Sequence, residues 1–450
     1  MHDDTSDVTS GISALRIASA PEGTCLQMCP RAEVLERTRT MEISRFERPP
    51  PGALSASSHE DVFSLAVKKY RRAAAGQLEL DRVELRPPHV LLHTLQHLFI
   101  NVLPWPGCGF DWPGGPPNNG SSSGSLVASD REQIDFLALY HFISDRVRSV
   151  RKDFTIQRIE DESAVQALES VVRFHLLASF RARALLQVKH QGDWSETLND
   201  QQLVSALSQL QVLYQKRSNS PSTMKNQKRP GDLEIGTADG NESEFVAYDI
   251  LLHADDPRAV SFLLIGVSQH TRRSVRVKRA LALFVALQTQ DFHNFSLNFQ
   301  LSSPLEKTLV LKHLPTMWTT GVRMLNKAFG KQDQFRMDEF AQWLSLSGVD
   351  AARTLCGAIN LHTEAPPEAP EAPAKPSDSW EDADVQVPPA PVIVQQAAGF
   401  IRFKVSPLNA EVDKVTIERL LVESAQRVFL DEICGLQGAR DLVLNKKPKS

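Results

Sequence analysis

Two cysteines four positions apart, Cys25 and Cys29, have the residue type and spacing of half a metal or redox site. A structural zinc takes four ligands, however, and the local sequence offers only these two. The other cysteines stand alone: Cys108, Cys356 and Cys434. The spacing also differs from the CxxC of thioredoxin-like redox motifs. The pattern therefore favours a structural role, in which Cys25, Met28 and Cys29, followed by Pro30, dock an extended N-terminal strap onto a helical body through small, soft side chains.

Three histidines, His89, His93 and His97, follow one another at intervals of four on one face of a predicted helix. Imidazoles at i and i+4 can share a metal ion, as in zinc proteases, which also place a glutamate beside the first histidine. This chain has Val90 there, and the third histidine would lie about 12 Å along the axis from the first. The spacing favours a stripe that faces solvent or a partner.

Catalytic motifs of the common enzyme classes are missing from the sequence. There is no GxSxG serine motif and no Cys-His family signature. The glycines of 114–124 fall in a tract rich in Gly, Pro, Asn and Ser, whereas phosphate-binding loops join a strand to a helix. We expect a non-enzymatic protein without cofactor or metal. An unrecognised hydrolase is the alternative.

The densest basic cluster consists of Arg272, Arg273, Arg276, Lys278 and Arg279. Guanidinium groups fork onto two phosphate oxygens, so one interpretation is a contact with an RNA backbone or a dock for an acidic peptide. The other interpretation is a solvated loop and helix start. The sequence leaves both open.

A second basic group consists of Lys327, Lys331 and Arg336, which could approach a phosphate backbone. The helix expected to enter a groove, 351–360, offers only Arg353, and reading base edges requires polar side chains there. We therefore expect this surface to suit a protein partner, and we expect no sequence-specific DNA binding.

Composition bounds the class of protein. The chain has 450 residues and 42% hydrophobic content, enough for two or three domains with a sizeable core. Its 50 basic and 54 acidic residues give a net charge of −4, so any nucleic-acid binding depends on local patches. Five cysteines fit a reducing compartment, the N-terminus is no signal peptide, and no apolar run approaches the roughly 20 residues of a membrane span. We expect a soluble intracellular protein.

The elements that must position these residues are predicted to be mainly helical. Residues 1–20 are expected to be flexible and 21–51 to form the strap. Residues 52–303 carry apolar positions at helical spacing, with helices predicted over 63–75 and 89–103. Successive antiparallel helices predict a right-handed, TPR-like solenoid, although no strict 34-residue repeat is visible. Two tracts within it are predicted to be disordered loops: 104–128 and 216–243.

Residues 304–407 have the helix, strand, helix, helix order of a winged-helix module. Its short first strand is expected at 334–337, and its strand pair begins at His362 and at Phe400. Between them, 364–396 holds eight prolines and seven acidic residues, which predicts a disordered, expanded wing; a plain linker is the alternative. Residues 408–450 are expected to form a C-terminal helix and a basic tail, a weak candidate for a nuclear import signal.

Four sequence blocks resemble the SAC-three/GANP family. The first runs from Gly23 to Pro30 and continues with Arg37, Phe46 and Glu47. The second spans 142–157 and holds the charged residues Asp145, Arg146, Arg148, Arg151 and Asp153. The third is Arg173-Phe174-His175 and the fourth is 244–248. They occur in the family's order over roughly 21–362.

The second block mixes acidic and basic residues at helical spacing. It predicts a buried or semi-buried network of ion pairs that joins solenoid helices, with Asp145 paired to Arg148 or Ser149 on its own helix. A direct role in binding a ligand is the alternative.

The resemblance implies a PCI-type fold, a helical solenoid closed by a winged helix, and a scaffold function in the TREX-two complex of nuclear mRNA export. It implies a PCI-domain partner, a small acidic peptide of the proteasome-lid type that clamps the solenoid, and binding of mRNA by the joined winged helices. It places the protein in the nucleus, at or near the nuclear pore.

Departures from the family pattern limit what the resemblance implies. The sequence has neither phenylalanine-glycine repeats nor a long tryptophan-anchored helix, and so resembles the family's short single-domain branch. Part of that branch is linked to centrosomes and spindles. The alternative is therefore a centrosomal or cytoplasmic interaction protein without RNA binding. A PCI subunit like those of the proteasome lid or of translation factors rests on fold analogy alone.

Overall fold

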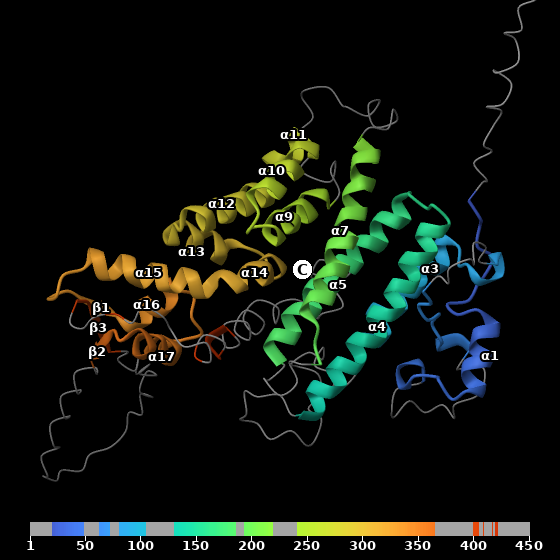
Figure 1. Ribbon diagram of the computed structural model, residues 1–450, viewed down its shortest axis with the longest axis horizontal. Helices are drawn as coiled ribbons and strands as arrows, with labels where there is room; N and C mark the ends of the chain where they lie inside the picture. The colour runs from blue at the N-terminus through green and yellow to red at the C-terminus, as the bar shows by residue number, and fades with distance from the viewer. Residues whose placement is uncertain are drawn as a thin grey trace, which may run out of the picture. The chain divides into compact units, whose positions relative to one another are not determined.

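Helices form nearly all the regular structure in the computed structural model of the chain (Figure 1). The structure describes residues 20–48, 63–72, 81–104, 130–185, 193–218, 241–364 and 399–404, with positions 408, 416 and 419–421. The predictions of a flexible N-terminus, of the two disordered loops, of the wing insert and of the C-terminal helix and tail fall mostly outside these residues. The chain divides into two compact units: among the described residues, those up to Ala178 and those of 193–218 form the first, and those of 179–185 and from 241 onward form the second.

The first unit contains the strap and the long helices that follow it. Its elements are α1 (Arg31–Arg39), η1 (Arg45–Glu47), η2 (Arg82–Glu84), α3 (Pro88–His97), the π-helical turn η3 (Leu98–Val102), α4 (Asp130–Ile156), α5 (Glu162–Leu185, in this unit up to Ala178) and α7 (Glu196–Ser218). Figure 1 shows α4, α5 and α7 side by side. Aromatic rings fill their core, where Phe174 of α5 lies 5.6 Å from Phe99 and 6.2 Å from Tyr140 between ring centroids.

Two sequence predictions in this unit need correction. The helix predicted over 63–75 is helical only at 63–65, and 66–72 has no regular secondary structure. Both ends of the predicted disordered tract 216–243 are helical: a helix begins at Glu242, and α7 continues through Lys216 and Arg217, which pair with Glu160 and Glu162 at 2.5 and 2.8 Å. The helix predicted over 89–103 is confirmed as α3 with η3.

The second unit begins with helices packed around a buried one. They are α9 (Glu242–Leu252), α10 (Pro257–Gly266), α11 (Gln269–Arg273), α12 (Val275–Thr289), α13 (Phe292–Leu301), α14 (Pro304–Val310) and the turn η4 (Leu311–His313). α9 is buried from Glu244 to Leu251, and its neighbours in the unit include α12 and α14. The fourth sequence block, which includes Phe245 and Tyr248, is the buried part of α9.

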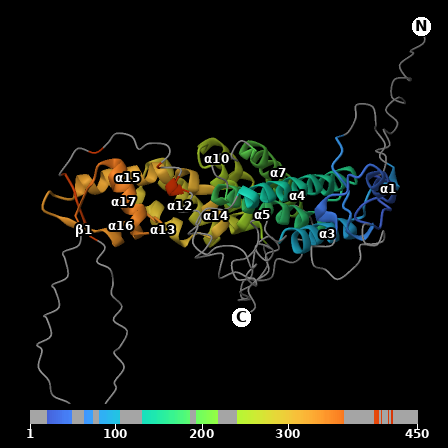
Figure 2. The same ribbon diagram turned by 90° about the horizontal axis from the view of Figure 1, so that it is seen from below.

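A small mixed module completes the second unit (Figure 2). It consists of α15 (Leu314–Ala328), β1 (Gln334–Arg336), α16 (Met337–Trp343), α17 (Val349–Ile359), β2 (His362–Glu364) and β3 (Phe400–Arg402). β3 lies between β1 and β2 and is antiparallel to both, with Ile401 opposite Phe335 and Thr363. The predicted strand pairing is confirmed, but the insert starts later than predicted, since Glu364 belongs to β2.

The module packs on α13 through aromatic side chains. The indole N–H of Trp318, which is fully buried, donates to the Leu344 carbonyl at 2.8 Å. Trp343 lies edge-on to Phe292 of α13 with centroids 4.7 Å apart. The α9–α13 helices and the module thus share one core.

Among the helices that the structure describes, none has the length and apolar character needed to cross a membrane.

Candidate functional site: the strap interface and the basic surfaces

The strap begins as an extended segment beside η2. The backbone N–H groups of Thr24 and Cys25 donate to the carbonyls of Arg82 and Leu85 at 3.0 and 2.9 Å. Gly23 allows this approach, because a Cβ there would lie 2.5 Å from the Leu85 carbonyl oxygen. The glycine that opens the first sequence block is therefore required by main-chain packing.

The two cysteines are packing residues in this structure. Cys29 is fully buried in a cluster with Val34 and Ala66, and the Cys25 thiol donates to the Gln27 carbonyl at 3.3 Å. Burial, followed by the nearby Glu33 carboxylate, raises the pKa of the Cys29 thiol, so this side chain is a poor nucleophile. No group of three His, Cys, Asp or Glu side chains placed to hold a metal occurs among the described residues.

The segment 66–72 is held by four consecutive backbone N–H groups. Those of Val67, Lys69 and Tyr70 donate to carboxylates, and that of Lys68 donates to the Met28 carbonyl at 3.1 Å. The acceptors are Glu47 at 3.0 Å, Glu33 at 2.8 Å and Asp145 at 3.2 Å. Because these N–H groups bond outside their own segment, they do not form the hydrogen bonds of the predicted helix.

Glu47 is the centre of the first buried ion cluster. Its carboxylate binds Arg37 of α1 and, at 3.3 Å, Arg146 of α4. All three side chains are at most 4% exposed. The Arg146 guanidinium also lies 4.5 Å from the centre of the Phe142 ring, which packs against Phe46 at 5.3 Å. This cluster ties α1 and η1 to α4.

Asp153 is the centre of the second ion cluster. It accepts from Lys68 Nζ at 3.0 Å and from Arg86 Nε at 2.8 Å. Arg86 is fully buried and uses its other nitrogens on the Met28 carbonyl and the Ser149 hydroxyl, at 3.1 and 3.0 Å. One arginine thus joins the strap, the segment before α3 and α4.

The second sequence block mainly contacts the strap and the segment 66–72, which corrects the predicted network between solenoid helices. Asp145 accepts from the Tyr70 N–H and from Arg146 at 2.5 Å, and does not pair with Arg148 or Ser149. Arg148 instead lies over the Tyr70 ring at 4.3 Å.

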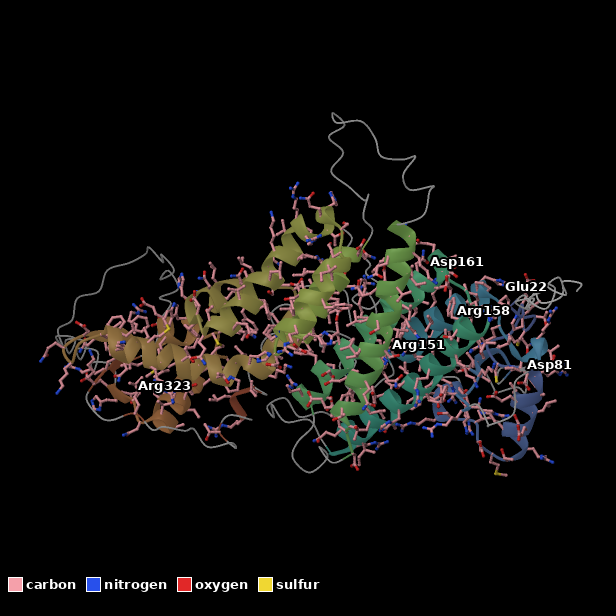
Figure 3. The ribbon with its side chains drawn as sticks, turned by 45° about the horizontal axis from the view of Figure 1, so that its top comes forward. Glu22, Asp81, Arg151, Arg158, Asp161 and Arg323 are labelled. Atoms are coloured by element: carbon pink, nitrogen blue, oxygen red, sulfur yellow. The ribbon has the colours of Figure 1, made fainter. Side chains whose placement is uncertain are left out.

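Arg151 is the member of this block that turns toward another long helix (Figure 3). Its guanidinium donates to the Ser205 hydroxyl and to Gln209 Oε1 on α7, at 2.7 and 2.9 Å. All its hydrogen-bond partners among the described residues are neutral. Burial, assisted by repulsion from Arg148, lowers the pKa of Arg151 to about 10.

The third block places a buried histidine between helices. His175 Nδ1 donates to Asn199 Oδ1 at 2.8 Å, which also accepts from the Tyr140 hydroxyl at 3.1 Å. Burial lowers the pKa of His175 to about 4. The imidazole is therefore a neutral, structural group at physiological pH.

Sequence reasoning did not single out Lys68 and Arg86. Each directly follows an apolar residue that is itself buried, in Val67-Lys68 and Leu85-Arg86, and that pattern was the available signal. Gln157, the last residue of the second block, connects both ends of this interface. Its side chain accepts from the Gly23 N–H and donates to the Arg86 carbonyl, each at 2.8 Å.

The first basic cluster contains residues of two kinds, those paired with a carboxylate and those exposed to solvent. Arg276 pairs with Glu244 of α9 at 3.5 Å, and Arg279 pairs with Glu306 of α14 at 3.7 Å. Arg272, Arg273 and Lys278 remain exposed. Arg272 also donates to the Val267 carbonyl at the end of α10, at 3.0 Å.

The second basic group also contains both a residue paired with carboxylates and residues exposed to solvent. Arg336 pairs with Asp338 at 2.6 Å and approaches Glu339 at 3.7 Å, so its charge is neutralised locally. Lys327 and Lys331 are exposed. Lys404, two residues after β3, is a further cation here, and its Nζ donates to the Lys327 carbonyl at 3.1 Å.

The predicted histidine stripe is shorter than the sequence indicates. His89 and His93 are exposed, but His97 is buried, and its Nδ1 lies 3.2 Å from the Asn101 amide nitrogen. Burial, followed by His93, lowers the pKa of His97. The prediction was wrong for His97, which is buried where the helix continues into η3 and faces Asn101.

Known proteins match this chain over most of its described residues. The sequence model of the SAC3/GANP family matches residues 28–365. SAC3 family protein B of Arabidopsis thaliana is 24% identical over 337 residues, which cover 73% of this chain and 17% of the plant protein. Protein xmas of Drosophila melanogaster is 25% identical over 322 residues, covering 70% of this chain and 13% of the fly protein.

A yeast relative gives the same result. SAC3 family protein 1 of Schizosaccharomyces pombe is 28% identical over 239 residues, covering 53% of this chain and 18% of the yeast protein. The matched region is less than a fifth of each of these three relatives. The match to the family model spans the strap interface, the buried α9 and the module up to β2, and the chain belongs to the SAC3/GANP family.

Proposed function

We propose that this protein is a non-enzymatic scaffold of the SAC3/GANP type that pairs with a PCI-domain protein in nuclear mRNA export. The observation that carries the proposal is the use of the signature side chains. Arg37, Glu47, Arg146 and Asp153 are buried in ion clusters that fix the strap to α4. These charged side chains stabilise the fold through buried ion pairs, which is the role expected of them in a scaffold.

The partner surface in this proposal is the module formed by α15–α17 and β1–β3, taken as a winged helix that closes a right-handed solenoid. The order of helices and strands supports that assignment, as does the shared core with α13. A PCI-domain protein would bind through its own winged helix, and a small acidic peptide would clamp the assembly, as the family resemblance implies.

RNA binding by the assembled complex is the finer part of the proposal. Among the predicted candidates, those that keep an exposed charge are Arg272, Arg273 and Lys278 on one surface and Lys327 and Lys331 on the other, where Lys404 adds a further cation. Arg276, Arg279 and Arg336 each pair with a carboxylate, so we do not propose them as the primary phosphate contacts.

Affinity purification of the tagged full chain from its native cells tests the partner. We expect a PCI-domain protein and a small acidic peptide, with RNA that is lost after nuclease treatment. Cross-links from the PCI protein to Lys327 and Lys331 would place it on the module. Recovery of centrosomal proteins without a PCI protein or RNA would contradict the proposal and favour the centrosomal alternative.

Charge reversal tests the RNA contact. Arg273→Glu with Lys278→Glu should weaken RNA binding of the purified complex and reduce the slope of log affinity against log salt by about 1 for each phosphate that is no longer neutralised. Arg39→Glu, an exposed arginine of α1, is the matched control and should change neither the affinity nor the slope. An unchanged slope in the double variant would exclude this surface.

A further inference from the structure

An apolar groove of about 250 Å3 opens on the first unit between the end of α4, the start of α5 and α7. Its apolar lining includes Leu95, Val150, Phe154, Leu168, Val171 and Leu213. Val212 also lines it and is 48% exposed. The volume lies below the roughly 300–1,000 Å3 of small-molecule pockets, but it accommodates a bulky apolar side chain of a peptide.

Two arginines line the same groove, Arg151 and Arg158, and both are labelled in Figure 3. Arg151 donates only to neutral groups of α7, and neither arginine forms an ion pair with a carboxylate in the part of the chain that the structure describes. Glu160 also lines the groove, but it is bound to Lys216 at 2.5 Å. The groove thus combines an apolar lining with uncompensated positive charge.

The backbone of Arg158 gives an independent indication that its position matters. Arg158 follows α4 with φ 49°, a left-handed conformation in which helices usually place glycine. The Ile159 N–H donates to the Phe154 carbonyl at 3.1 Å, which closes the helix end in this conformation. The Arg158 guanidinium therefore lies beside the groove at a backbone position where glycine would be less strained.

We infer that this groove binds a short segment of a partner protein that inserts a bulky apolar side chain and presents an aspartate or glutamate to Arg151 and Arg158. A carboxylate is the group that a guanidinium binds with two parallel hydrogen bonds, and the apolar lining explains the neighbouring side chain. The helix dipole of α4 favours positively charged residues such as Arg151 and Arg158 near its C-terminus. It does not explain why an apolar groove lies beside them.

Nucleic acid is a poorer occupant. Single strands bind to grooves through exposed aromatic faces on which bases stack, together with a track of positive charge. The aromatic residue of this lining, Phe154, is 7% exposed. The inference concerns a different surface from the module and does not depend on the proposed PCI partner.

Selection of a random dodecapeptide phage library on the full chain tests the inference. We expect enriched peptides that carry an apolar residue next to aspartate or glutamate. Measured by fluorescence anisotropy, they should lose about tenfold in affinity for Arg158→Gly, which removes one charge-assisted hydrogen-bonding group. Val212→Glu, at a half-exposed position of the lining, should lose at least as much. Higher salt should weaken binding to the native chain.

The two variants separate binding from folding. Arg158→Gly relieves the left-handed backbone, so its thermal midpoint should equal or exceed that of the native protein. Arg131→Ala is the control and should bind the peptides normally, because the Arg131 side chain lies in the first turn of the same helix and is 92% exposed. The inference is overturned if no peptide distinguishes the native chain from Arg158→Gly and Val212→Glu, if the enriched peptides lack the acidic-apolar pattern, or if single-stranded RNA competes for the groove.

Discussion

Carboxylates in the strap interface act on the main chain as well as on arginines. Glu47 accepts the backbone N–H groups of Ser44 and Val67, at 3.1 and 3.0 Å, besides binding Arg37 and Arg146. A residue with four partners in a fully buried position can be replaced only with a large loss of stability, because each partner is then left without water or an acceptor.

Glu47→Gln should lower the free energy of unfolding of the first unit by about 3–5 kcal/mol, because two buried guanidinium groups lose their counter-charge. Urea denaturation followed by circular dichroism measures the decrease. Glu42→Gln is the control: this carboxylate is exposed and pairs with Lys69 at the surface, so its replacement should have little effect. Equal decreases in the two variants would show that the buried cluster does not hold the strap.

His175 should make the protein acid-sensitive. Burial depresses the pKa of His175 from 6.5 to about 4, so the unfolded chain binds the proton first as pH falls. The stability of the neutral form is complete above pH 6.5 and decreases toward pH 4, by about 1.4 kcal/mol per pH unit and about 3 kcal/mol in all.

Denaturation of His175→Gln and the native chain at pH 7.5 and 5.5 checks this expectation. The variant should lose less stability between the two pH values than the native chain, whatever its stability at pH 7.5. His89→Gln, which changes an exposed histidine, should keep the native pH dependence. A parallel decline in all three proteins would assign the acid sensitivity to other groups.

At the scale of elements, the strap is the part whose position depends on main-chain contacts. The strap starts beside η2, and the separate segment 66–72 crosses between α1 and α4 and is held by four backbone N–H groups. Such contacts need residues without side-chain bulk at the closest approach, and Gly23 is the point where this requirement is strictest.

Gly23→Ala should destabilise the docked strap by about 1–3 kcal/mol, because the new methyl group would overlap main-chain atoms that cannot rotate away. Limited proteolysis should cleave the strap faster, while α4 and α5 remain protected. Gly357→Ala is the opposite control: nothing lies within 4 Å of the added Cβ in the last turn of α17, and helix propensity should raise stability by about 0.5–1 kcal/mol. A strap that resists protease as well in Gly23→Ala as in the native chain would contradict this account.

At the scale of the molecule, the predictable features were those with a local period. The α3 helix, the buried α9 and the pairing of His362 with the strand near Phe400 follow from apolar spacing and from proline and glycine at the ends. The path of 66–72 did not, because its N–H acceptors come from α1, η1 and α4. The sequence also did not predict that Arg276 pairs with Glu244 and Arg279 with Glu306, since these pairs depend on which helices pack together.

Replacing 366–397 by about eight Gly and Ser residues tests the wing interpretation. We expect the module to keep its cooperative unfolding and to gain about 1 kcal/mol, because each halving of a flexible connection lowers the closure cost by about 0.6 kcal/mol. Fluorescence of the module tryptophans, Trp318 and Trp343, reports the transition, and the replacement also removes Trp380 from the signal. Loss of the transition would show that the tract contributes to the fold.

The position of β3 in the sheet has a consequence for biosynthesis. β3 is the middle strand, yet it leaves the ribosome after both of its neighbours, β1 and β2. At about 5–20 residues per second, translation from Glu364 to Phe400 takes roughly 2–7 s. During that interval β1 and β2 are synthesised but lack their shared partner strand, and their unpaired edges are open to aggregation or to binding by a chaperone. A chain terminated before Phe400 would keep these edges unpaired.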